Sequence, residues 1–236
     1  TRVIADLAVK YGTRKFVMVS TDKAVNPTNV MGCSKRICEI YVQSLDQAIK
    51  DGKVSGRTQF VTTRFGNVLG SNGSVIPLFK EQIKRGGPVT VTHKDIIRFF
   101  MLIPEACKLV LEAGTMGNGG EIFVFDMGKP VRIVDLAERM IRLSGVKGIE
   151  IRFTGLRDGE KLYEEVLNEE ETSKPTFHPK IKIAQVRAYD YADANLRIDA
   201  LVHACAVEGD MQIVKRMKEI VPEFKSQHSK YEVLDE

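Results

Sequence analysis

The 236-residue sequence lacks the features that mark several large classes of protein. Its net charge is only +4, from 35 basic and 31 acidic residues, which is too small for the basic stripe of a nucleic-acid-binding protein. No apolar run approaches the roughly 18 to 20 residues of a membrane helix. The first residues do not form a secretory signal. We therefore expect no nucleic-acid partner and no membrane segment in this chain.

Cysteine and histidine are scarce and are not spaced as metal ligands. The four cysteines include no Cys-x-x-Cys pair and are Cys33, Cys38, Cys107 and Cys205. The four histidines share no ligand spacing and are His93, His178, His203 and His228. This pattern predicts no metal site. It also predicts that the thiols are small buried apolar groups in a protein of a reducing compartment.

Glycine-rich phosphate-binding turns are also missing. The chain has neither Gly-x-Gly-x-x-Gly nor Gly-x-x-x-x-Gly-Lys-Ser/Thr. The nearest approach is Gly70-Ser71-Asn72-Gly73, but the next glycine position of the motif is occupied by Ile76. Taken alone, this absence argues against nucleotide binding.

Hydrophobic periodicity predicts alternating helices and strands. The expected helices span residues 2–11, 31–50, 74–84, 104–113, 133–143 and 159–167, with a last one capped by Asp210. The expected strands span residues 16–19, 59–65, 89–92, 121–125 and 149–153, and residues 169–179 are expected to form an exposed excursion. Strands that alternate with helices indicate βαβ units and a parallel sheet.

The start of the chain and the strand count suggest part of a larger fold. The sequence opens without methionine, inside a helical pattern. Only three strands, over residues 15–20, 59–65 and 121–125, suit a doubly wound sheet, which normally has about six. We therefore expect earlier strands and their glycine turn to precede Thr1.

Polar residues gather directly after the first expected strand. Ser20, Thr21, Asp22 and Lys23 stand at its carboxyl end, where open α/β sheets bind their ligands. Met31 and Lys35 follow on the next helix, four residues apart and therefore on one face. On these residues alone, an active site and an ordinary polar loop with a surface lysine are equally good interpretations.

Residues 20–35 closely resemble the active-site stretch of extended short-chain dehydrogenase/reductases that act on nucleotide sugars. More specifically, they resemble the bacterial UDP-N-acetylglucosamine 4,6-dehydratase group of polysaccharide-biosynthesis proteins. Further blocks resemble the same group, over residues 64–70, 73–79, 87–92, 98–101, 103–106, 125–128 and 155–165. The resemblance extends from residue 1 to about residue 185, and the last fifty residues match weakly.

This resemblance implies an α/β fold that comprises the C-terminal part of a Rossmann-like doubly wound parallel sheet and a smaller mixed α/β substrate-binding domain. Residues 1–70 would form the second half of an NAD(P)-binding domain, to which residues 115–128 return a strand. Residues 71–185 would mainly bind the nucleotide sugar. Residues 186–236 would form a C-terminal helical extension.

The resemblance also implies an internal redox reaction with bound NADP or NAD. The sugar is oxidised at C4, water is eliminated across C5 and C6, and the hydride returns to C6. Asp22 would be the acid and Lys23 the base of the elimination, Ser20 or Thr21 would bond the C4 oxygen, and Lys35 would hold the nicotinamide ribose. Because Asp22 must keep its proton and Lys23 must lose one, we expect their side chains to point at different substrate atoms.

Met31 departs from the superfamily pattern, which has a tyrosine base at this place. A thioether cannot usefully accept the C4 hydroxyl proton. Either Thr21, Asp22 or a water held by Lys35 performs this deprotonation, or activity is low. A plainer reading is that Met31 only packs on its helix.

The remaining roles follow from the same resemblance. Ser20, Lys35, Arg64 and Phe65 are expected to contact the cofactor. The residues expected to contact the nucleotide sugar are Asn67, Val75, Ile76, Pro77, Lys80, Thr90, Arg98, Arg157 and Glu160. Of these, Arg98 and Arg157 suit the phosphates, because guanidinium groups match phosphate oxygens bidentately.

Three functions stay open at this stage. The first is a UDP-N-acetylhexosamine 4,6-dehydratase, which the Asp22–Lys23 pair favours. The second is a 4-epimerase or a dehydratase that inverts C5. The third is a non-catalytic nucleotide-sugar-binding module, which Met31 and the missing glycine turn favour. We expect the protein in the cytoplasm, or at the inner face of the membrane in a longer form, and as a homo-oligomer paired through long helices such as 31–50.

Overall fold

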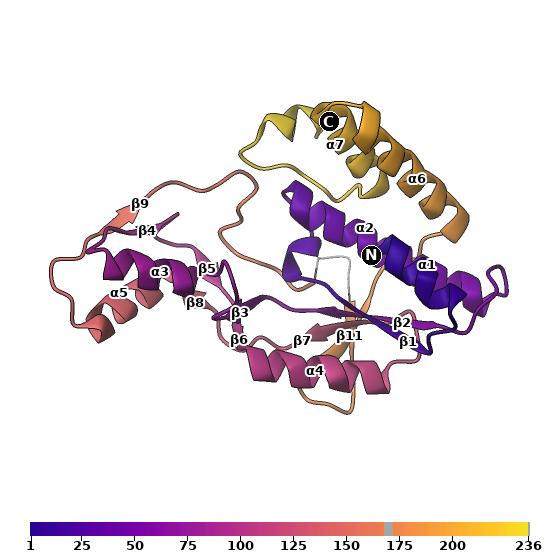
Figure 1. Ribbon diagram of the computed structural model, residues 1–236, viewed down its shortest axis with the longest axis horizontal. Helices are drawn as coiled ribbons and strands as arrows, with labels where there is room; N and C mark the ends of the chain where they lie inside the picture. The colour runs from indigo at the N-terminus through magenta and orange to yellow at the C-terminus, as the bar shows by residue number, and fades with distance from the viewer. Residues whose placement is uncertain (168–171, 236) are drawn as a thin grey trace.

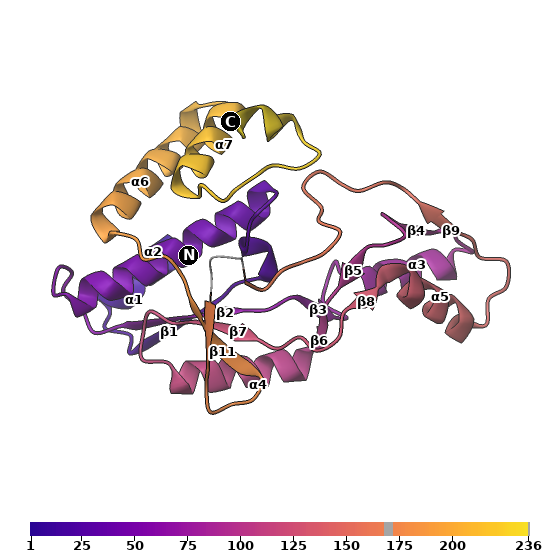
Figure 2. The ribbon, with the colours of Figure 1, turned by 180° about the vertical axis from the view of Figure 1, so that it is seen from behind.

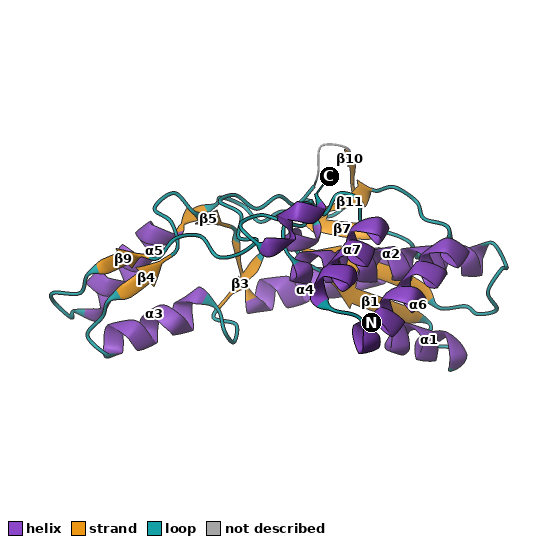
Figure 3. Ribbon diagram, turned by 90° about the horizontal axis from the view of Figure 1, so that it is seen from above, coloured by secondary structure: helices purple, strands orange, loops and turns teal. Residues whose placement is uncertain are grey.

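The computed structural model describes residues 1–167 and 172–235 and places a five-stranded sheet beside a smaller lobe (Figures 1 and 3). The sheet has the strand order β1-β2-β7-β11-β10. Its members are β1 (Lys15–Val19), β2 (Gln59–Arg64), β7 (Ile122–Phe125), β11 (Ile181–Gln185) and β10 (Thr172–Pro175). Strands β1, β2 and β7 pair in parallel, whereas β11 and β10 pair antiparallel. The α/β fold class with a parallel sheet is therefore confirmed.

Helices cover both faces of the sheet, as Figures 1 and 2 show. Helix α2 (Val30–Lys50) lies on one face and α4 (Ile103–Met116) on the other, and α1 (Arg2–Lys10) packs beside α2. All four residues of β7 are buried, as expected of a parallel strand covered on both faces. Asn29 caps α2, because its side-chain oxygen accepts a bond from the Gly32 N–H at 2.8 Å.

The smaller lobe is built from three two-stranded pairings. Strand β3 (Asn67–Leu69) pairs with β6 (Phe100–Leu102), β4 (Val89–Val91) with β9 (Ile151–Phe153), and β5 (Ile97–Arg98) with β8 (Val131–Arg132). Helices α3 (Val75–Lys84) and α5 (Ile133–Ser144) pack on the β4–β9 pair (Figure 1). Phe79, Val89 and Ile96 are at the centre of this lobe's own apolar core.

The C-terminal segment packs on α2 rather than standing apart. Helices α6 (Tyr191–Val207) and α7 (Asp210–Ile220), with the short η2 (Lys230–Leu234), lie against α2 on the side away from the sheet (Figure 1, orange to yellow). Ile37 and Tyr41 of α2 share a buried cluster with Ile198 and Met217. One side of α2, the helix expected to contribute to pairing with a second copy, is thus covered by the same chain.

Several expected elements differ from those observed. Residues 159–167 are not helical, because the Gly159 carbonyl accepts side-chain bonds from Thr28 and Asn29 instead of a helical one. Part of the expected excursion forms β10, while residues 168–171 of the chain lie outside the described residues. Adding β11, which we did not expect, the described sheet has five strands, not three. Gly209 is the N-cap of α7, and Asp210 is already its first residue.

Two features are absent from the described residues. No helix within residues 1–167 and 172–235 combines the length and the apolar character needed to cross a bilayer. No group of three or more potential metal ligands occurs in the same part of the chain.

Candidate active site

The first polar residues after β1 are held by backbone bonds to the neighbouring strand. The Ser20 N–H donates to the Thr63 carbonyl at 2.7 Å, and the Asp22 N–H donates to the Phe65 carbonyl at 3.1 Å. The chain then turns into the short η1 helix (Asp22–Ala24), whose N-cap is Thr21. Asp22 and Lys23 are thereby fixed at the carboxyl edge of the parallel strands, next to the smaller lobe.

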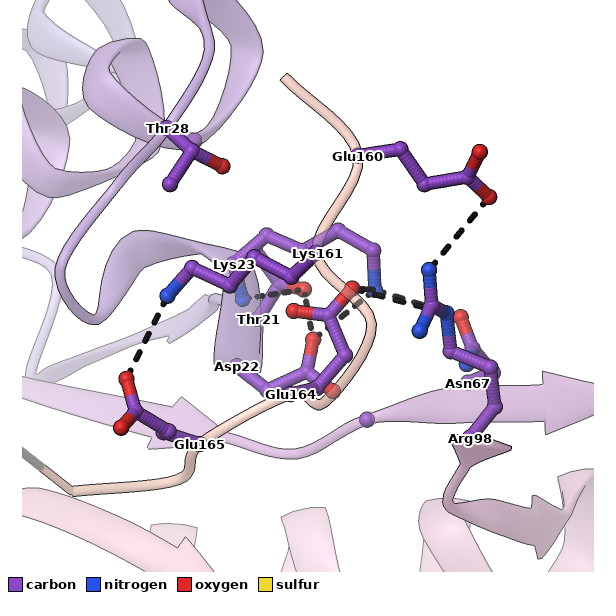
Figure 4. A network of polar contacts seen from close by, with 12 residues as sticks. Thr21, Asp22, Lys23, Thr28, Asn67, Arg98, Glu160, Lys161, Glu164 and Glu165 are labelled. Carbon is purple, nitrogen blue, oxygen red and sulfur yellow. Dashed lines mark hydrogen bonds and ion pairs between the residues drawn. The ribbon is translucent and has the colours of Figure 1, made fainter. Parts of the chain in front are cut away.

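Asp22 and Lys23 form an ion pair with each other. The Lys23 Nζ lies 3.0 Å from Oδ1 of Asp22, which is fully buried (Figure 4). The Thr21 hydroxyl donates to the same oxygen at 2.9 Å. The two side chains therefore point at each other, and the carboxylate holds the ammonium, while our expectation that they point at different substrate atoms stays a prediction.

The other oxygen of Asp22 has no partner among the described residues. It faces Gly66, where an added Cβ would lie only 2.8 Å from Oδ2. Since Gly66 has ordinary backbone dihedrals, this close approach is a reason for glycine at position 66.

Lys23 also contacts the smaller lobe and the loop after β9. Its Nζ lies 3.3 Å from Oδ1 of Asn67 and 3.6 Å from Oε1 of Glu164 (Figure 4). Glu164 comes from residues 155–165, so three separate segments of the chain converge on one ammonium group.

Glu164 is a site residue that sequence reasoning missed. Its side chain is 4% exposed, its Oε1 lies 3.6 Å from Nε of Arg98, and its Oε2 has no partner among the described residues. Burial raises the pKa of Glu164, and the Asp22 carboxylate adds to this, although Lys23, Arg98 and Lys161 act in the opposite direction. The only signal in the sequence is the block that contains it, where two adjacent glutamates look like a solvated surface.

Arg98 and Glu160, two residues expected to bind substrate, contact each other. The Arg98 NH2 lies 3.4 Å from Oε1 of Glu160, which also accepts from the Thr92 hydroxyl at 3.2 Å. The Arg157 N–H donates to the other Glu160 oxygen at 3.1 Å. In Figure 4 the Arg98 guanidinium lies between the carboxyl groups of Glu160 and Glu164.

A cleft of about 580 Å³ opens between the sheet and the smaller lobe beside this network. The residues expected at the site that line it are Lys23, Met31, Asn67, Val75, Thr90, Arg98, Arg157 and Glu160. A second hollow of about 220 Å³ shares Lys23 and Arg98 and adds Glu164. The first of these volumes is in the range of small-molecule sites.

Ile76, Pro77 and Lys80 were expected to frame a base but do not line this cleft. They lie on α3, where Pro77 and Lys80 are exposed. Of the α3 residues expected there, Val75 alone lines the cleft. Leu78 and Phe79, one turn further along α3, also line it.

Met31 and Lys35 lie on the exposed side of α2. Met31 is 48% exposed and lines the cleft, so it does not simply pack on its helix. Lys35 lies one turn further along and has no ion-pair or hydrogen-bond partner within the described part of the chain. The two side chains therefore present a thioether and an ammonium group along one helical face.

Ser20, Arg64 and Phe65 have structural contacts instead of the expected cofactor contacts. The Ser20 hydroxyl donates to Oε1 of the buried Glu39 at 2.7 Å, and the Arg64 NH2 lies 2.7 Å from Oε2 of Glu39. Burial alone would raise the pKa of Glu39, but Arg64, Arg36 and Ser20 together lower it. Phe65 stacks on Phe125 with ring centroids 5.3 Å apart. Ser20 and Arg64 thus hold Glu39 of α2 against the sheet, whereas Phe65 belongs to the core on the α4 side.

The chain is similar in sequence to proteins of one known family. The family model described as polysaccharide biosynthesis protein matches residues 1–186. The capsular polysaccharide biosynthesis protein CapD of Staphylococcus aureus is 52% identical over 92% of the chain, and the probable polysaccharide biosynthesis protein EpsC of Bacillus subtilis is 54% identical over 78%. The chain spans 35% and 30% of these two relatives. A UDP-glucose 4-epimerase of Rickettsia rickettsii is 39% identical over 74% of the chain and 49% of its own length.

Solved structures resemble the chain as well. The X-ray structure of Pen from Bacillus thuringiensis is 32% identical, with a TM-score of 0.71 over 84% of this chain and 66% of that one. A dTDP-glucose 4,6-dehydratase from Bacillus anthracis, solved in complex with NAD, has a TM-score of 0.57 over 71% of this chain and 56% of that one. At 19% identity, the dehydratase shows a shared fold only.

Proposed function

The chain belongs to the family of polysaccharide biosynthesis proteins, and from this premise we propose that it acts as a nucleotide-sugar 4,6-dehydratase on UDP-N-acetylglucosamine. The observation that carries the proposal is the Asp22–Lys23 pair at the edge of the interlobe cleft. Elimination of water across C5 and C6 needs a base at C5 and an acid at the departing C6 oxygen. An amine and a carboxyl group at the edge of one cleft can supply both once substrate has separated them.

In this proposal Lys23 removes the C5 proton and Asp22 protonates the C6 oxygen. Substrate must separate the two groups, because each is held by the other in the 3.0 Å ion pair. The unpartnered Oδ2 of Asp22 offers a position for the proton that the acid carries. Asn67, bonded to Lys23, keeps the amine directed toward the cleft once Asp22 has released it.

The oxygen at C4 needs a hydrogen-bonding group that the helix face does not provide. The Met31 thioether is a weak acceptor and carries no proton. The Ser20 hydroxyl is engaged by the buried Glu39, whereas the Thr21 hydroxyl donates to Asp22, a partner that itself turns to the substrate in this proposal. We assign the contact with the C4 oxygen to Thr21.

The resemblance calls for NADP or NAD, and part of the described chain fits such a group. Lys35, without a partner among the described residues and one turn from the cleft-lining Met31, suits the nicotinamide ribose. Arg64 and Phe65 do not fit this role, because both are buried and in contact with core residues. When bound, the nicotinamide supplies the acceptor and later the donor of a hydride.

The nucleotide part of the substrate fits the cleft wall. Arg98 and Arg157 would bind the diphosphate, because guanidinium groups match phosphate oxygens bidentately. Glu160, which already accepts from Thr92, would accept from a ribose hydroxyl. Val75 and Thr90 would line the nucleoside side of the cleft.

A 4-epimerase is the second candidate, because the 39%-identical relative carries that name. An epimerase needs no acid–base pair at C5 and C6, and the Asp22–Lys23 contact therefore favours the dehydratase.

Proton NMR of the product separates the two functions. The chain, supplied with NADP or NAD and UDP-N-acetylglucosamine, should give a 6-deoxy-4-keto sugar with a new C6 methyl doublet. Inversion at C4 without a methyl signal would show an epimerase. Binding without turnover, for the chain and for a longer form, would show a binding module.

A further inference from the structure

Glu164 lies at equal distance from two of the cations that line the cleft, Lys23 and Arg98. Its Oε1 lies 3.6 Å from Nζ of Lys23 and 3.6 Å from Nε of Arg98. Both distances exceed those of a good N–H···O bond, so neither cation satisfies this carboxylate fully. The second oxygen, Oε2, is buried without a partner among the described residues.

The other charged groups around Glu164 come from three segments. Asp22 and Lys23 approach from η1, Arg98 from β5, and Lys161 from the loop that carries Glu164. Glu160, on the same loop, faces Arg98 at 3.4 Å. In the substrate-free cleft, three carboxylates thus surround Lys23 and Arg98.

A nucleoside diphosphate changes this balance at Arg98. Phosphate oxygens are strong acceptors for a guanidinium group, and Arg98 is in the wall of the cleft. As Arg98 turns to the phosphates, Glu164 loses one of its two close cations inside a buried site, and Lys161 remains as a more distant one. The Glu164 carboxylate then depends on Lys23, which it must share with Asp22.

We propose that Glu164 takes the ammonium proton of Lys23 when a nucleoside diphosphate occupies the cleft, which leaves Lys23 as the neutral amine. This inference rests on the proposed function, in which Lys23 is the C5 base. An N–H bond of Lys23 breaks, an O–H bond forms on Oε1 of Glu164, and the electron pair stays on the lysine nitrogen. One positive and one negative group become two neutral ones, with no proton exchanged with solvent.

Glu164 is better placed for this than Asp22. The Oδ1 of Asp22 accepts from both the Thr21 hydroxyl and the Lys23 ammonium, at 2.9 Å and 3.0 Å. Glu164 has no contact within those distances among the described residues, so its carboxylate is less stabilised. Burial also raises the pKa of Glu164, in the direction that favours uptake of a proton.

The test follows Lys23 directly by 13Cε NMR of lysine-labelled protein, with UDP as the probe and Lys23→Arg to assign the signal. On saturation with UDP at neutral pH, the Lys23 signal should move from the ammonium to the amine position. In Glu164→Gln it should stay at the ammonium position. Glu164→Asp, which keeps a carboxyl group, should restore part of the change. Glu165→Gln is the matched control, because Glu165 is an exposed neighbour paired with Lys161, and it should behave as wild type.

Calorimetry in two buffers of different ionisation enthalpy supplies an independent reading. Internal transfer predicts the same UDP-binding enthalpy in both buffers, whereas uptake of one proton from solvent would contradict Lys23 as the donor. An ammonium signal for Lys23 in the wild-type UDP complex would also overturn the inference, as would an amine signal in Glu164→Gln. Because these readings need only UDP, a chain that forms no 6-deoxy-4-keto sugar could still show the transfer, and the two proposals can fail separately.

Discussion

The backbone N–H of Gly159 donates to the carbonyl of Gln227 at 2.6 Å, which ties the C-terminal segment to the loop that carries Glu160 and Glu164. The same segment holds the loop before α2, since the Lys225 and Gln227 N–H groups donate to the carbonyls of Pro27 and Thr28. Three stretches that are distant in sequence are therefore joined beside the cleft. The C-terminal segment supports the site although it contributes none of the charged groups in it.

Gly159→Ala should disrupt this junction. Gly159 has a φ of +68°, and its new Cβ would lie 2.4 Å from Cβ of Asn29 and 2.7 Å from the Thr28 carbonyl oxygen. We expect the free energy of unfolding to fall by about 2–4 kcal/mol. We also expect the affinity for UDP to fall as the loop shifts. Urea unfolding and UDP calorimetry measure the two effects.

Gly155→Ala is the matched control for the close contact. Gly155 has a φ of +87° on the same loop, but a Cβ there would meet nothing within 4 Å. The free energy of unfolding of this variant should fall only by the roughly 1 kcal/mol that backbone strain costs, and its affinity for UDP should be unchanged. Equal losses in the two variants would show that the junction with residues 27–29 does not support the site.

The sequence predicted the parallel strands and the Asp22–Lys23 segment because both are local patterns. Strands β1, β2 and β7 are short apolar runs, and the polar residues follow β1 directly. Strand β11, with the sequence Ile181-Lys182-Ile183-Ala184-Gln185, was missed because it is short and directly follows the stretch that we read as an exposed excursion. Its partner is β7, more than fifty residues earlier, and such pairing is not visible locally.

Burial is the second property that the sequence did not reveal. Glu39, Arg64 and Glu164 are charged residues of the kind usually found on the surface, yet all three are buried. Each is buried because a partner from a distant segment reaches it, such as Ser20 for Glu39 and Lys23 for Glu164. Arg64 was therefore assigned to a cofactor, and Glu164 was given no role.

Gly66→Ala should impair the reaction more than the fold. The added Cβ would lie 2.8 Å from Oδ2 of Asp22 and would displace that carboxyl from its place beside Lys23. We expect a ten- to hundredfold fall in kcat, about what a 1 Å misplacement produces, with UDP binding unchanged. Steady-state kinetics and UDP calorimetry together make this distinction.

Gly114→Ala is the control for Gly66→Ala. Gly114 is in α4, away from the cleft, and its Cβ would meet only the Val17 side chain, at 3.2 Å. Its kcat should stay at the wild-type value. If Gly66→Ala retains full kcat, the open oxygen of Asp22 has no part in catalysis.

Glu39→Gln should destabilise the fold in a pH-dependent way. The substitution removes the negative partner of the buried Arg64 and Arg36, a loss of about 3–5 kcal/mol at neutral pH. The folded-state pKa of Glu39 is lowered, so its stabilising contribution is fully present above about pH 4.5 and is lost as pH falls through the folded pKa. The difference in unfolding free energy between wild type and variant should therefore shrink in acid.

Denaturant unfolding at neutral pH and at several acid pH values measures this difference. Glu81→Gln is the control, because it removes only an exposed pair with Arg85 and should change stability by less than about 1 kcal/mol. A gap between wild type and Glu39→Gln that stays constant down to the lowest pH would contradict the assigned direction of the Glu39 pKa.

Met31→Tyr should accelerate 4-keto sugar formation. Met31 lines the cleft at 48% exposure, and a tyrosine there would place a phenol one turn before Lys35, which has no partner among the described residues. The nearby ammonium favours the phenolate, which can accept the C4 hydroxyl proton that a thioether cannot. Met31→Phe supplies the ring without the oxygen and should give no acceleration, as measured by the initial rate of 4-keto product.

If Met31→Tyr is no faster than Met31→Phe, then deprotonation at C4 is not limited by the missing phenol, and Thr21 or a water held by Lys35 already performs it. Full activity in Met31→Ala would further show that the thioether has no direct role.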